Sequence, residues 1–149
     1  MQASSTPQGG RLAWHGWLLA GVFLLYSLAA AIDYMLSLFQ GAQYYRASGM
    51  TDAQVDYFSS LPLWVMGAWT CSVWAGVLAP MALLLRRRYS RALFALALCG
   101  TGLYSLYTLV LSAGREAMGD MWFMPPLIAA LTAGSVVYCH RLIKCQVLV

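Results

Sequence analysis

The sequence predicts an all-α membrane protein: a bundle of four transmembrane helices, with a short outer-surface helix between the first and second spans. Of its 149 residues, 61% are hydrophobic and only 9% are charged, whereas a soluble domain carries about 25% charged residues because it must face water. Crossing the hydrocarbon core takes roughly 20 apolar residues. Four stretches qualify, at about residues 14–39, 61–85, 92–112 and 122–138.

The basic residues predict how the bundle is oriented. A net charge of +4 would suit nucleic acid, but the charges lie in the gaps between apolar runs and form no polar face. The gap between the second and third spans contains no acid and four arginines: Arg86, Arg87, Arg88 and Arg91. Because positive residues stay cytoplasmic, we expect these arginines to be topology anchors beside anionic headgroups, with both termini cytoplasmic. The lipid bilayer is therefore a predicted partner, and nucleic acid is not.

The start of the chain allows two interpretations. Arg11 precedes an apolar stretch and residues 29–31 are all alanine, a pattern that a cleaved secretory signal would also show. Since the apolar character continues to Phe39, we interpret this segment as a retained helix. Residues 1–10 are small and polar, so residues 1–12 are predicted to form a disordered cytoplasmic tail. Residues 13–145 then form a single four-helix domain.

The first loop carries a helix-start signal of its own. Thr51 is followed three residues later by Gln54, which is a capping-box pattern. A short surface helix is therefore predicted over residues 52–59, and Pro62 then suits the start of the second span. The four cysteines show neither CxxC spacing nor a nearby histidine pair, so we interpret them as small apolar residues.

Several motifs together resemble a known family. They are Asp33-Tyr34, LPLW at 61–64, Trp69 and Trp74 followed by Gly76, and LLLRRRYSRALFALAL at 83–98. In this combination the chain resembles small four-span proteins of bacterial inner membranes, which are often labelled sugar transporters. The resemblance covers roughly residues 14–145 and implies a four-span inner-membrane topology. The chain departs from the family at Leu25-Tyr26, where members usually have Trp-Asn, and at Pro80, where they often have Gly.

Asp33 is the one carboxylate placed within an apolar segment. A charge in the membrane costs a few kcal/mol, so it normally faces the bundle and finds a partner. Counting about 1.5 Å per residue places Asp33, Trp69 and Thr108 at a similar height, about 24 Å above the inner face. The hypothetical binding residues of this polar layer are Asp33, Tyr34, Trp69, Tyr104, Tyr107, Thr108 and Arg115.

Helical spacing supports such a layer. Steps of three and four residues place side chains on one face of a helix. Three stripes follow this spacing: Tyr26, Ala30, Asp33, Ser37 and Gln40; Trp69, Ser72, Gly76 and Pro80; and Thr101, Tyr104, Thr108, Ser112 and Arg115. Faces of this kind mark helix contacts or a polar cavity.

Three roles for Asp33 remain open at this point. It can be an interfacial residue that bonds Tyr107 or pairs with Arg115 and holds the helices in register. It can line a solute-binding vestibule, or it can carry a coupling proton. His15 and His140 could in principle clamp a haem, but both fall at helix ends beside basic residues, so no cofactor is predicted.

No arrangement of catalytic residues or phosphate-binding glycines is present in the sequence, so enzymatic activity is not predicted. Two functions are carried forward. One is a small-solute transporter or channel-like component that works as an oligomer. The alternative is a non-catalytic accessory subunit of a larger membrane complex, which the lack of broken helices and of an inverted repeat brings almost level with the first.

Overall fold

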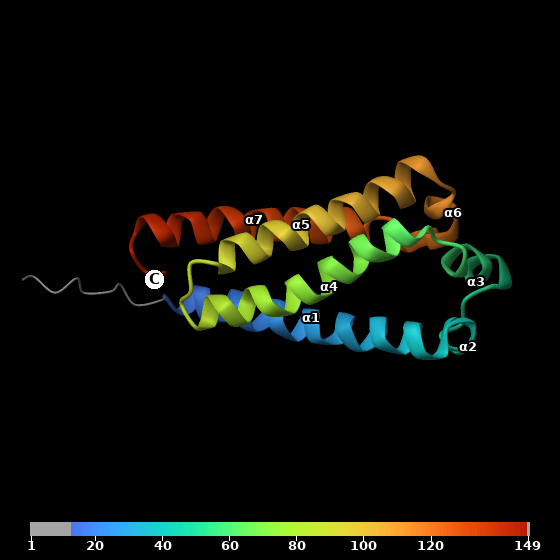
Figure 1. Cartoon of the computed structure of the whole chain (residues 1–149), viewed down its shortest axis with the longest axis horizontal. Helices are drawn as coiled ribbons and strands as arrows, with labels where there is room; N and C mark the ends of the chain where they lie inside the picture. Colours follow the sequence, from blue (N-terminus) through green and yellow to red (C-terminus); the bar gives the residue numbers. More distant parts are fainter. Residues whose placement is uncertain (1–12, 149) are drawn as a thin grey trace, which may run out of the picture.

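The computed structural model describes residues 13–148 (Figure 1). Four helical stretches are long and apolar enough to cross a membrane. They are α1 (Trp14–Gln40), α4 (Leu63–Leu84), α5 (Ser90–Leu106) continued by the π-helical turn η1 (Tyr107–Leu111), and α7 (Met124–Lys144). No strand occurs in this part of the chain. The predicted all-α, four-span fold is confirmed; the predicted tail, residues 1–12, lies outside the described residues.

Charge distinguishes the two ends of the bundle. We call one the basic end, which holds the α4–α5 turn with its arginines and the last turn of α7 with Arg141 and Lys144. The other is the acidic end, where three short helices lie: α2 (Ala42–Ala47), α3 (Asp52–Ser59) and α6 (Gly114–Met118), the last followed by η2 (Gly119–Met121) (Figure 1).

The short helix α3 begins where the sequence predicts, and by the predicted mechanism. The Thr51 hydroxyl accepts a hydrogen bond from the Gln54 backbone N–H, and the Gln54 side chain accepts one from the Thr51 N–H. Gln54 also donates to the carbonyl of Ala117 at 2.6 Å, which ties α3 to α6. The helices α2 and α6 were not predicted, because segments of five or six residues carry no periodic signal.

The α4 and α7 helices end in the same way at the basic end. Arg86 has a φ of 57°, and the N–H of Arg87 reaches back to the carbonyl of Ala82. Gln146 has a φ of 54°, and the N–H of Val147 reaches back to Leu142. Both are Schellman motifs, in which a left-handed residue, usually glycine, turns the chain and satisfies the last carbonyls.

These turns close the basic end. The second one directs Val147 and Leu148 into the bundle, where Leu148 is 1% exposed. The Arg86 side chain donates from Nε to the carbonyl of Val147 at 3.1 Å and holds the segment in place. The apolar cluster at this end contains Ala20, Ala79, Leu83, Phe94, Cys139, Val147 and Leu148.

The four spans pack in series: α1 against α4, α4 against α5, and α5 against α7 (Figure 1). The α4–α5 contact is very close, because a Cβ on Gly100 would lie 2.6 Å from the carbonyl oxygen of Ala68. Beside it, the hydroxyls of Ser72 and Thr101 are hydrogen-bonded at 2.5 Å. Small residues and hydroxyls at such contacts are typical of helices associating in lipid, where packing rather than water exclusion drives association.

Candidate functional site

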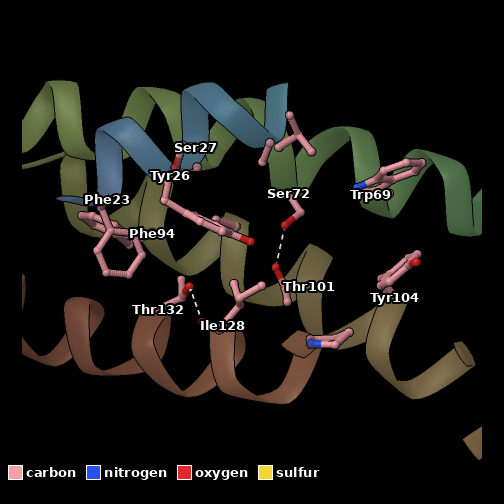
Figure 2. A pocket seen from close by; sticks show the side chains of 15 residues that line it. Phe23, Tyr26, Ser27, Trp69, Ser72, Phe94, Thr101, Tyr104, Ile128 and Thr132 are labelled. Carbon is pink, nitrogen blue, oxygen red and sulfur yellow. Dashed lines mark hydrogen bonds between the residues drawn. The ribbon is translucent and has the colours of Figure 1, made fainter. Parts of the chain in front are cut away.

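A cavity of about 160 Å³ lies among the four spans (Figure 2). Its lining comes from α1, α4, α5 and α7, and consists of Phe23, Tyr26, Ser27, Ala30, Trp69, Ser72, Val73, Gly76, Phe94, Ala97, Thr101, Tyr104, Pro125, Ile128 and Thr132. None of these side chains is charged. A well-formed, mostly apolar pocket with a few convergent polar groups is the usual form of a small-molecule site.

Aromatic pairs bound the cavity at both ends. Toward the basic end, the rings of Phe23 and Phe94 meet edge to face at 5.6 Å. Toward the acidic end, Trp69 and Tyr104 lie 6.0 Å apart. Between these pairs the facing positions are small, notably Gly76 and Ala97, so the bulky pairs separate the helices and the small residues leave the space unfilled.

The polar groups of the lining fall into two sets. Ser72 and Thr101 bond one another, and the Thr132 hydroxyl donates to its own helix, to the carbonyl of Ile128 at 2.7 Å. The second set has no hydrogen-bond partner among residues 13–148: the hydroxyls of Tyr26, Ser27 and Tyr104 and the indole N–H of Trp69. Figure 2 shows the Tyr26 hydroxyl pointing into the cavity, on the side of Ser72 and Thr101.

The cavity opens on the flank between α1 and α7. These two helices meet toward the basic end, where the rings of His15 and Tyr138 lie 5.7 Å apart. Figure 1 shows them on opposite edges of the bundle further along. Tyr26 lines the cavity and is nevertheless 43% exposed, and α1 and α7 make no extensive contact in the described part of the chain, so this flank is the least covered side of the cavity.

Asp33 does not lie where the sequence predicts. Its carboxylate is exposed and accepts a hydrogen bond from the hydroxyl of Tyr44, which α2 brings back over the end of α1. This bond raises the pKa of Tyr44 above its ordinary value, with burial adding to the effect. The predicted contact with the third span or with Arg115 is wrong, and Asp33 does not line the cavity.

The face that α1 presents to the bundle explains the error. Its buried residues include Ala20, Ser27, Ala31 and Tyr34, at helical spacings of seven, four and three. The small residues let α4 approach, and Tyr34 continues the same line. Asp33 precedes Tyr34 by one residue, which is a rotation of about 100° away from this face.

The structure brings three of the predicted layer residues together. The ring of Trp69 contacts Tyr34 at 5.1 Å and Tyr104 at 6.0 Å, so that aromatic side chains from α1, α4 and α5 form one row. The hydroxyl of Tyr34 is bonded to Thr70 at 2.6 Å. Trp69 and Tyr104 line the cavity, and Tyr34 packs behind Trp69.

The other predicted residues lie apart from the cavity. Tyr107 packs on Trp64 at 5.3 Å. Thr108 is fully buried, and its hydroxyl bonds the carbonyl of Tyr104 at 2.9 Å. The Arg115 guanidinium lies 4.8 Å from the ring centroid of Trp122. Their roles are to pack and cap the acidic end.

The sequence stripes located part of the cavity and missed the rest. The positions 26, 30, 69, 72, 76, 101 and 104 belong to those stripes and line it. The α7 contribution was not predicted, because Pro125, Ile128 and Thr132 are unremarkable in an apolar span. The phenylalanines at 23 and 94 look like ordinary lipid-facing or core residues in the sequence.

The anchor arginines and the cysteines behave as ordinary structural residues. Arg91 bonds His140 of α7 at 2.9 Å, while Arg87 and Arg88 are exposed at the basic end. The four cysteines are free in the structure, and Cys139 is buried in the apolar cluster. In the described part of the chain, no group of three His, Cys, Asp or Glu side chains could hold a metal ion.

Comparison with protein-family models, with curated proteins and with solved structures finds no match for this chain. The chain is a multi-pass membrane protein on the strength of its four apolar helices.

Proposed function

We propose that this chain is a multi-pass protein of the bacterial inner membrane that binds a small uncharged solute and serves as a component of a transport system. The observation that carries the proposal is the cavity, to which all four spans contribute. Its lining has unpaired hydrogen-bond donors and no charge, so it suits an uncharged molecule with acceptor groups. The resemblance to a family labelled as sugar transporters agrees with this proposal.

The proposed orientation has both termini in the cytoplasm. It is supported by the excess of arginine and lysine at the basic end, where no acid lies among the described residues, and by the placement of the loop acids at the other end, where only Arg46 and Arg115 of the described basic residues lie. A reporter enzyme fused to the C-terminus should be active only in its cytoplasmic form. Activity of a periplasm-specific reporter at that position would overturn the orientation.

Transport would require more than one copy of the chain. A cavity of about 160 Å³ is close in volume to an engineered cavity of about 150 Å³ that holds a benzene molecule. Such a space binds a small group but provides no path across a bilayer. We therefore propose that the chain works as a homo-oligomer.

The test uses one substitution that places a large side chain in the cavity and a control substitution at the adjacent residue, outside the cavity. Ala30 lines the cavity, whereas Ala29 is exposed and lies about 100° around the same helix turn, outside the cavity lining. The variants Ala30→Phe and Ala29→Phe, in lipid nanodiscs, are screened against uncharged solutes by thermal unfolding. We expect a stabilising solute to be found whose effect is lost in Ala30→Phe and kept in Ala29→Phe.

Uptake of the same solute into proteoliposomes should follow the same order. Equal effects of the two substitutions on binding, or stabilisation by no solute at all, would contradict a binding role. Binding without uptake would leave the cavity as a ligand site and remove transport from the proposal.

A second candidate function is an accessory subunit of a larger membrane complex. The observation that favours it is on α7, where Ala130 and Gly134 are exposed one helical turn apart and a Cβ on Gly134 would meet nothing within 4 Å. Small residues at this spacing let helices approach closely. Gly134→Leu should then abolish co-purification of the chain with unrelated subunits in mild detergent. Gly102→Leu on α5 is the control, because a Cβ at Gly102 also meets nothing within 4 Å, and it should leave co-purification unchanged.

A further inference from the structure

The unpaired donors of the cavity indicate what its ligand must provide. The hydroxyl of Tyr26 and the indole N–H of Trp69 have no partner among the described residues, whereas the Tyr104 hydroxyl points away from the cavity (Figure 2). In an apolar environment an unpaired hydroxyl costs free energy that a bound acceptor recovers. Since the Tyr26 hydroxyl and the Trp69 indole N–H can both donate and neither is charged, the matching group on a ligand is a neutral acceptor such as a carbonyl oxygen.

The walls indicate the shape of the group that enters. The two aromatic pairs, Phe23 with Phe94 and Trp69 with Tyr104, lie at opposite ends of the space. A volume of about 160 Å³ suits a single ring. Ring faces and edges at both ends favour contact with another ring, which stacks or packs edge-on.

The open flank indicates where the rest of the ligand lies. On this flank the cavity is lined by Tyr26 and Ala30 of α1 and by Pro125 and Ile128 of α7, all of which are partly or largely exposed. These positions belong to helices that cross the membrane, so this flank faces hydrocarbon and not water. An alkyl chain passing through it would remain in lipid.

From these three features we infer that the ligand is an uncharged amphiphile from the lipid phase. Its head is a single ring bearing a carbonyl-type acceptor, bound in the cavity and bonded to Tyr26. Its tail passes between α1 and α7 into the bilayer. The inference rests on the proposed function of the cavity and names the class of molecule that it binds.

Three probes separate the parts of this inference: dodecanophenone, a phenyl ketone with an alkyl tail; dodecylbenzene, which lacks only the carbonyl; and acetophenone, which has the ring and carbonyl but almost no tail. Radiolabelled dodecanophenone should bind the full chain in nanodiscs saturably. Dodecylbenzene should bind about fivefold more weakly, the effect of one lost hydrogen bond. Ala30→Phe should abolish the binding of both, and Ala29→Phe should not.

Tyr26→Phe tests the acceptor bond specifically. It should weaken dodecanophenone about fivefold and leave dodecylbenzene unchanged, a difference that a merely structural effect of the substitution would not produce. Tyr107→Phe is the matched control, because Tyr107 is a half-buried tyrosine of the same span as Tyr104 that does not line the cavity. Equal loss for both probes in Tyr26→Phe would overturn the assigned bond.

The remaining outcomes distinguish this inference from the proposed function. Saturable binding of acetophenone without dodecanophenone would show that the cavity holds a ring but admits no tail, and would overturn the lipid-phase assignment alone. The lipid-phase assignment would also be overturned if a water-soluble solute bound, if Ala30→Phe blocked that binding, and if neither ketone bound. No binding of any probe or solute would overturn both.

Discussion

The α4–α5 contact and the α1–α7 flank differ in how closely two helices of one bundle pack. At the α4–α5 contact a glycine lies against a backbone carbonyl and two hydroxyls bond across the interface. At the α1–α7 flank the helices meet through His15 and Tyr138 toward the basic end, and beyond them a cavity opens. Small residues thus allow close contact between α4 and α5, whereas at the cavity the aromatic pairs hold the helices apart and the small residues between them leave space.

This difference follows from what drives helix association in lipid. Apolar side chains gain nothing from leaving lipid for another apolar surface, so stability comes from close packing and hydrogen bonds. The contacts in series from α1 to α7 supply these, and the closure of the basic end by Val147 and Leu148 adds packing. The remaining flank can stay open without loss of the fold, and this is where a ligand site can exist.

The largest expected effect comes from breaking the close contact. In Gly100→Ala the new Cβ would lie 2.6 Å from the Ala68 carbonyl oxygen and 3.0 Å from Ser72, so α4 and α5 must separate. We expect a loss of about 1–3 kcal/mol in the free energy of unfolding, measured by titration with sodium dodecyl sulfate. Gly102→Ala, where nothing lies within 4 Å, should be neutral or stabilising by up to about 1 kcal/mol. Similar losses for the two variants would show that the contact is looser than described.

A smaller effect is expected from the hydroxyl pair at the same contact. A double-mutant cycle with Ser72→Ala and Thr101→Val isolates the bond of 2.5 Å between the two side chains. Interhelical bonds in membranes average about 0.6 kcal/mol with a maximum near 1.7, and we expect a coupling energy within that range. Additive losses would mean that the two hydroxyls do not interact and that packing alone holds α4 to α5.

The smallest effect concerns the free end of α1, which is held by its own turn and not by α7. The Tyr44 hydroxyl donates to Asp33, and this raises the pKa of Tyr44 above its ordinary value of 10.0. Because the folded protein favours the protonated hydroxyl, the stabilisation is complete below about pH 10 and is lost as the pH rises through the raised pKa. Tyr44→Phe should remove one late-titrating tyrosine from the absorbance titration without changing the binding of ketones in the cavity. A titration identical to that of the parent chain would show that the bond is absent.

The sequence was sufficient to predict the four spans and α3, because each depends on local composition or on a local capping pattern. It also located much of the cavity lining on α1, α4 and α5, since polar and small residues at helical spacing mark inward faces. The α7 lining and the open flank depend on which helices are neighbours, and no local pattern in the chain reports that.

The position of Asp33 illustrates a different limit. Its charge predicted that the side chain points into the bundle, but the face of α1 that packs against the bundle is determined by the small residues at 20, 27 and 31. A carboxylate near the end of a 27-residue helix can find its partner in the following turn, as Asp33 does with Tyr44. A prediction from charge alone therefore fails where a helix is long enough to leave the hydrocarbon.

The π-helical turn at Tyr107–Leu111 also affects how insertions and deletions would act on this chain. Such a turn holds one more residue than an α-helical turn, and here the Ser112 hydroxyl bonds the carbonyl of Tyr107, five residues back, at 3.0 Å. Ser112 also bonds Tyr57 of α3 at 2.6 Å. Deleting one residue from the turn would restore ordinary α-helical winding and rotate Ser112 by about 100° relative to α5, which would detach α3 while leaving the membrane-embedded part of α5 in phase. The extra residue therefore sets the angular offset between the transmembrane helix and the cap above it, so related chains that lack it should have a differently placed α3.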